Sequence, residues 1–178
     1  MGVEVFTADE QSEQPVDTMR WLRLARAVLE AEGVKGDAEL SLVFVDEAAI
    51  TDLNRRFAGK DGPTDVLSFT FHDEPAPSGR HPDHRGNGPN WTPDATEPPV
   101  LLGDVYICPA VAARNAPDHA GTYEDELALL VVHGILHLMG RDHVVAAEAE
   151  AMERREQELL GELHRKQPVG PASDGTSA

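Results

Sequence analysis

The chain has little of several features that would place it in a specialised class of protein. Its single cysteine, Cys108, cannot form an internal disulfide, and aromatic residues make up only 5% of its 178 residues. Its longest apolar run, 127–139, contains two histidines and is shorter than the roughly 20 residues that span a bilayer. The N-terminus lacks the basic start and apolar stretch of a signal peptide. We therefore expect a cytoplasmic protein without a membrane partner, in which Cys108 is a buried strand residue and not a nucleophile.

Basic residues are also scarce, with 15 Lys and Arg against 32 Asp and Glu, so the formal net charge is −17. A field of this sign repels nucleic acid at long range and argues against non-specific DNA binding. A nucleic-acid substrate would therefore need a local positive groove, a metal ion or a partner protein. Apolar residues make up 40% of the chain, which is enough for the core of one domain.

The periodicity of apolar residues predicts strands interleaved with helices, followed by a helical final third. Strands are expected at 3–8, 39–45, 64–71 and 100–108. Helices are expected after the capping residues Asp17, Asp46 and Thr122, from Pro109, and over 144–163. In the helix after Asp46, the side chains of Ile50, Leu53 and Phe57 are predicted to share one face. The pattern indicates an α/β (α+β) fold, with a small mixed β-sheet and helices packed on it.

Two segments have no such period. Residues 73–99 contain seven prolines and three glycines, which predicts a long loop insert. A lid or partner-binding role for this insert stays open beside plain disorder. Residues 165–178 are expected to form a disordered tail. The remaining chain, 1–164, is expected to form one domain.

Three histidines near the end of the helix after Thr122 have the spacing of metal ligands. On a helix, His133 and His137 lie one turn apart and point the same way, so both can reach one ion at about 2.0–2.1 Å. Gly140 allows the chain to leave the helix and bring His143 to the same ion. Three neutral imidazoles leave one coordination position open, which is typical of a catalytic zinc. The sequence therefore predicts one zinc ion per chain.

Other interpretations of these histidines remain. In one interpretation they are ordinary residues of a buried helix. In another they are ligands of a structural zinc, although no fourth Cys or His ligand follows nearby. Imidazole also suits nickel and iron. Asp142 either orients a ligand imidazole, which we prefer, or accepts a proton from metal-bound water. The other histidines are interpreted as surface residues: 72, 81, 84, 119 and 164. The acidic residues of 148–162 are interpreted as a solvated helix face.

The spacing of the three histidines is that of the metzincin proteases, in which a glutamate base follows the first histidine. Here that position holds Gly134. The lost carboxylate argues against a peptidase and fits an anionic substrate such as a phosphodiester.

The chain resembles the YbeY endoribonucleases, also called rRNA maturation factors. The similarity rests on the histidine motif at 133–143 and on the segments 63–69, 101–108 and 150–156. It implies an α/β domain over 1–164 with a zincin-like metal-binding helix. It also implies single-strand-specific RNA cleavage in small-subunit rRNA maturation and ribosome quality control.

Two positions depart from the family pattern. Arg141 stands where the family usually has a tyrosine, and Ala58 follows Phe57 where the family has an arginine to which a catalytic role is ascribed. We do not carry that role over to this chain, so its catalytic residues stay unassigned. Arg56, Lys60 and Arg141 are candidate phosphate contacts, with plain solvation as the alternative for each.

The leading hypothesis is a zinc-dependent endoribonuclease that acts on an rRNA precursor and meets the small ribosomal subunit or its proteins, but not DNA. Zinc would acidify its bound water and polarise a phosphate oxygen. A second hypothesis is a ribosome-assembly factor that works mainly by binding basic ribosomal proteins, which suits an acidic chain. A metallopeptidase is the third, and Gly134 argues against it.

Overall fold

The computed structural model describes residues 2–34, 37–70, 100–139 and 146–164, with only the backbone described at 100 and 146–148. The predicted loop insert at 73–99 and the predicted tail at 165–178 lie outside these residues. None of the helices in the described ranges is long and apolar enough to cross a membrane.

A four-stranded mixed sheet forms the centre of the fold, in the order β1-β2-β4-β3. The strands are β1 (Val3–Asp9), β2 (Ala38–Phe44), β3 (Val66–Phe69) and β4 (Val100–Ile107). Strands β1, β2 and β4 run parallel, whereas β3 pairs antiparallel with β4 and forms one edge. The predicted mixed sheet is confirmed.

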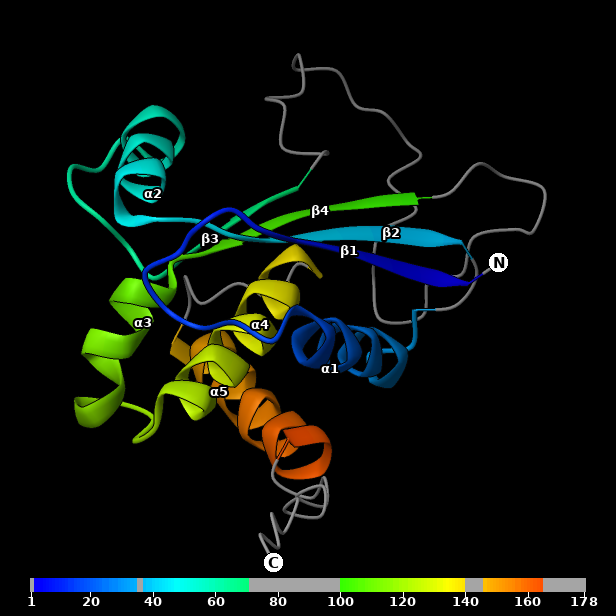
Figure 1. Cartoon of the computed structure of the whole chain (residues 1–178). Coiled ribbons are helices and arrows are strands. Elements are labelled where there is room, and N and C mark those ends of the chain that lie inside the picture. Colours follow the sequence, from blue (N-terminus) through cyan, green and yellow to red (C-terminus); the bar gives the residue numbers. More distant parts are fainter. Residues whose placement is uncertain (1, 35–36, 71–99, 140–145, 165–178) are drawn as a thin grey trace, which may run out of the picture.

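Helices cover both faces of this sheet. They are α1 (Thr18–Ala31), α2 (Glu47–Leu53), α3 (Pro109–Asn115), α4 (Tyr123–Leu138) and α5 (Ala146–Leu159), with short turns η1 (Asn54–Ala58), η2 (Ala116–Asp118) and η3 (Leu160–His164). Figure 1 shows α2 on one face, α1 and α4 on the other, and α5 beyond α4. Helix α4 is therefore the central layer on its side, between the sheet and α5.

The predicted helix caps are present. The side chains of Asp17, Asp46 and Thr122 accept hydrogen bonds from backbone N–H groups three residues later, at 3.1, 2.8 and 3.1 Å. Each bond satisfies an N–H that has no partner within its helix. These local contacts explain why the helix starts were predictable from the sequence.

The expected common face of the helix after Asp46 is wrong at Phe57. Ile50 is fully buried, but Phe57 is 65% exposed. From Asn54 to Ala58 the chain forms a π-helix, which has more residues per turn than an α-helix. Phe57 consequently falls off the face that carries Ile50, and Gly59, at φ 67°, ends the turn in the left-handed region.

Helix α4 approaches the sheet very closely at two glycines. A Cβ on Gly134 would lie 2.6 Å from Cγ1 of Val105 on β4. A Cβ on Gly103 would lie 2.1 Å from the carbonyl oxygen of Phe69 and 2.9 Å from Cδ2 of Leu138, and Gly103 has a φ of 145°. The spacing of β3, β4 and α4 therefore depends on the absence of side chains at these two positions.

A Gly103→Ala substitution should lower the free energy of unfolding by about 2 kcal/mol or more, because it adds steric overlap with β3 to an unfavourable backbone angle. Urea denaturation measures this change. Gly161→Ala is the matched control, since nothing lies within 4 Å of a Cβ built there. Equal stability of Gly103→Ala and the control would contradict the inferred packing.

Candidate active site

One stripe of helix α4 faces away from the sheet. Asp125, Leu129, His133 and His137 recur every four residues and are half-buried, whereas most other residues of the helix are buried. The imidazole rings of His133 and His137 lie 5.5 Å apart, centroid to centroid, at an interplanar angle of 68°. The prediction that these two histidines share one face is confirmed.

The rest of the predicted metal site lies outside the described residues. This applies to the third predicted ligand His143, to its neighbours Asp142 and Arg141, and to Gly140. Among the residues that the structure describes, no three His, Cys, Asp or Glu side chains form a metal-binding group. The zinc ion and its open coordination position therefore stay predictions.

A buried carboxylate contacts the first predicted ligand. Glu156 of α5 is 7% exposed, and its Oε1 forms a short contact with Nδ1 of His133. The interpretation of the acidic stretch as a solvated face is wrong at this residue. A signal was present in the sequence, because Glu156 takes a core position in the helical period of Met152, Leu159 and Leu160, all three of which are buried.

Neighbouring contacts hold α5 and η3 against the other helices. Arg155 donates from Nε to Oε1 of Glu32, at the end of α1, at 2.5 Å. His164 lies 2.9 Å from Asp125, from Nε2 to Oδ1, and its side chain is only 9% exposed. The expectation that His164 is a surface residue is therefore wrong. These contacts keep Glu156 beside His133.

His133 opens onto a cavity of about 320 Å³ between α4, α5 and the residue before β3. Its polar lining consists of Asp65, His119, His133, Glu153, Glu156 and Gln157. His119 is mostly exposed, as expected, but its Nδ1 lies 2.9 Å from both oxygens of the fully buried Glu126. The backbone N–H of Ala120 also donates to Glu126, at 3.1 Å. The cavity is thus lined by histidines and carboxylates, with half-buried His133 on one wall.

Gly134 faces the sheet and not this cavity. The hydroxyl of Ser68 on β3 donates to the carbonyl of Gly134 at 3.1 Å. A Cβ built on Gly134 would point toward Val105. Successive residues of a helix are rotated by about 100°, so a side chain at 134 would point away from the stripe of histidines. A glutamate at this position would collide with β4 in this arrangement, which is a steric reason for the missing peptidase base.

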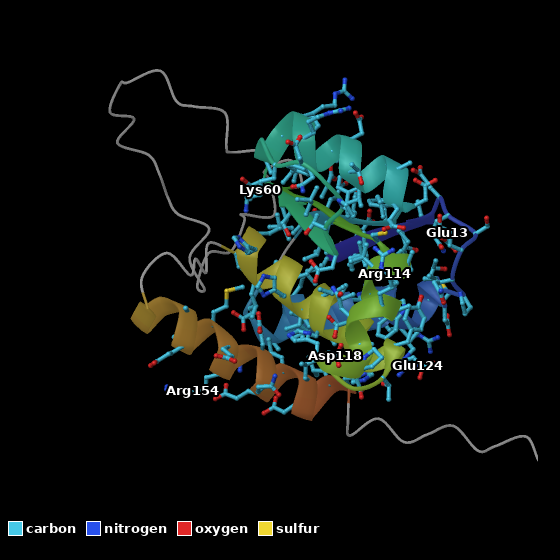
Figure 2. All side chains as sticks on the ribbon, turned by 90° about the vertical axis from the view of Figure 1, so that its left-hand side faces the viewer. Glu13, Lys60, Arg114, Asp118, Glu124 and Arg154 are labelled. Atoms are coloured by element: carbon cyan, nitrogen blue, oxygen red, sulfur yellow. The ribbon has the colours of Figure 1, made fainter. Side chains whose placement is uncertain are left out.

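The described candidate phosphate contacts are not among the residues that line this cavity. Arg55 and Arg56 each pair with Asp52 at 3.3 Å, and both are well exposed, as is Lys60. Figure 2 shows Lys60 above α4, on the side of α2, and Arg154 below it on α5. The contact of Arg56 and Lys60 with phosphate stays a prediction.

Cys108 is fully buried, as predicted, but it follows β4 as the N-cap residue of α3 and is not a strand residue. Burial raises the pKa of its thiol, so the sulfur stays protonated at neutral pH. This agrees with a packing role for Cys108.

Comparison with known proteins agrees with this architecture. The family model described as "Endoribonuclease YbeY" matches residues 6–164. A protein of that name from Frankia alni is 39% identical, covering 98% of this chain and 94% of the relative, and one from Pelotomaculum thermopropionicum is 43% identical, covering 80% and 83%. The solution structure of TM1509 from Thermotoga maritima matches 97% of this chain and 99% of its own, with 25% identity and a TM-score of 0.53. This chain belongs to the YbeY family of endoribonucleases, and is thus a hydrolase that acts on RNA.

Proposed function

We propose that this endoribonuclease uses one zinc ion, held by His133, His137 and His143, to cleave single-stranded RNA of a small-subunit rRNA precursor, and that it serves ribosome quality control. The observation that carries the proposal is the contact between Glu156 and Nδ1 of His133. A carboxylate in that place is the usual partner of a histidine that binds metal through its other nitrogen.

The chemistry of the imidazole supports this assignment. When Glu156 accepts a hydrogen bond from the Nδ1–H of His133, the lone pair of the ring that can bind a metal is on Nε2. The two ring nitrogens point in different directions, so a carboxylate on Nδ1 does not occupy the position of a metal on Nε2. His137, one helical turn away, offers a second imidazole on the same face. The described residues thus fit two of three zinc ligands.

When bound, zinc supplies a Lewis acid for a phosphate oxygen and acidifies coordinated water. The residues of the chain do the rest. Glu156 holds the ring of His133, and the packing of Gly134 against Val105 fixes the turn of α4 between the two histidines. The cavity beside His133 gives a phosphodiester access to that side of the helix.

Zinc removal by chelation should abolish cleavage of single-stranded RNA, and zinc should restore it, with duplex RNA of the same sequence cut far more slowly. His137→Ala should lower the rate at saturating RNA by at least about 100-fold, because it removes a predicted metal ligand. A fluorescent RNA in a gel assay measures these rates.

Arg26→Gln is the control, because Arg26 is an exposed residue of α1 that pairs with Glu30 and does not line the cavity. Its rate should stay close to that of the unmodified chain. Equal cleavage by His137→Ala would point to a contaminating nuclease. It would also favour the alternative of an assembly factor that acts mainly by binding.

Glu156→Gln should weaken zinc binding by about 10- to 100-fold, the usual effect of losing such a partner. The amide of glutamine can donate to Nδ1, which favours the tautomer with a proton on Nε2 and so competes with the metal. Competition with a chromophoric chelator measures the affinity. Glu153→Gln is the control, since Glu153 is an exposed residue of the same helix and lines the same cavity. Unchanged zinc affinity of a folded Glu156→Gln protein would contradict the assignment.

A further inference from the structure

Three aromatic side chains form a row from β4 to the surface. The ring of Tyr106 on β4 lies 5.7 Å from that of Phe69 on β3, and Phe69 lies 5.2 Å from Phe57, centroid to centroid. Both pairs meet edge to face, at 68° and 64°. Such contacts are favourable and hold the rings in defined orientations. Phe57, at the outer end of the row, is therefore an oriented ring.

The outermost ring is exposed although it is large and apolar. Phe57 is 65% exposed, whereas Phe69 is half-buried. The π-helical turn carries it outward, as described above, and π turns inside helices are frequent at functional sites. Much of the Phe57 surface is therefore open to solvent.

Exposed charged residues flank Phe57 in the chain, and all of those between 55 and 61 except Asp61 are cationic. Arg55 and Arg56 precede Phe57 and Lys60 follows it, and all three are exposed. Both arginines share the single carboxylate of Asp52, so they carry more positive charge than that partner neutralises. The phosphate groups of a nucleotide whose base stacks on Phe57 would meet this local positive charge.

Strand β3 links the aromatic row to the candidate active site, although the side chains of its neighbouring residues Ser68 and Phe69 point to opposite faces of the sheet. Phe69 follows Ser68, whose hydroxyl donates to the carbonyl of Gly134, the residue after His133. Strand β3 is the sheet edge, so a strand of RNA that leaves the face of α4 would pass around β3 to reach Phe57. The two places are thus linked through one edge strand.

We propose that Phe57 is a stacking site for one base of single-stranded RNA, a subsite across the edge strand β3 from the candidate active site that helps to select unpaired RNA. The inference rests on the proposed function. Stacking of bases on aromatic rings is largely independent of sequence, and a base in a duplex is not available for it. An aromatic contact also suits an acidic chain, because it needs no charge.

Phe57→Leu should weaken binding of a short fluorescein-labelled single-stranded RNA about 5-fold or more, because it removes the aromatic face and keeps an apolar side chain. Fluorescence anisotropy in the presence of a chelator measures the affinity without cleavage. Phe6→Leu is the matched control, because Phe6 is also exposed, at 53%, but lies on β1 at the opposite edge of the sheet. Phe6→Leu should leave the affinity unchanged.

Two further arms test stacking itself. A strand of the same length without bases should bind the Phe57→Leu and unmodified proteins equally. Phe57→Trp should retain the affinity, and its indole fluorescence should fall when RNA is added, whereas that of Phe6→Trp should not.

Phe57→Leu with unchanged affinity, or with only a lower melting temperature, would overturn the subsite. No measurable binding of single-stranded RNA by the unmodified protein would overturn it as well. Cleavage that depends on zinc but not on Phe57 would refute the subsite alone. Binding that depends on Phe57 without any zinc-dependent cleavage would refute the proposed function and leave the subsite standing.

Discussion

The contact between Glu156 and His133 is the constraint on which the candidate active site depends. It joins α5 to α4 at the half-buried imidazole of His133. A more exposed carboxylate would be hydrated by water, whereas the buried Glu156 needs a partner within the protein. The preceding residue, Arg155, pairs with Glu32 at the end of α1. Two neighbouring side chains of α5 therefore bind two different helices, so that the rotation of α5 about its axis is fixed. A shift of α5 would break both pairs and release the ring of His133.

The opposite side of α4 is fixed by close packing and not by polar contacts. Gly134 and Gly103 allow the helix and two strands to approach until Ser68 reaches a backbone carbonyl of α4. A closely packed interior resists small displacements, so this approach sets where the turn from His133 to His137 lies. The same approach explains the absence of a glutamate base at 134, since its side chain would have to enter the sheet. At Gly134, the need for a residue without a side chain and the absence of a peptidase base therefore have the same cause.

Features that depend on local sequence were predictable. The caps at Asp17, Asp46 and Thr122, the mixed sheet and the shared face of His133 and His137 follow from spacing and from short-range hydrogen bonds. The errors arise where a distant segment or an irregular turn decides. The sequence predicts Glu156 and His164 to be exposed, because their partners on α4 are 23 and 39 residues away and leave no local signal. An α-helical period predicts Phe57 on the face of Ile50, because this period does not include a π turn.

A net charge of −17 is compatible with an RNA substrate when the position of each charge is considered. Several carboxylates are engaged inside the fold, where Glu156 meets His133, Glu126 meets His119 and Glu32 meets Arg155. Of these pairs, Glu32 with Arg155 joins opposite charges and is compensated locally, whereas the phosphate backbone responds to charges near its own path. In the segment 55–61, which contains Phe57, the exposed charged side chains are Arg55, Arg56, Lys60 and Asp61. An enzyme that holds RNA by few phosphate contacts, a metal and a stacked base should lose little affinity with added salt, because few counterions are released on binding. The total charge therefore affects how fast RNA approaches from a distance. The local arrangement of rings and cations affects how tightly RNA is bound in the complex.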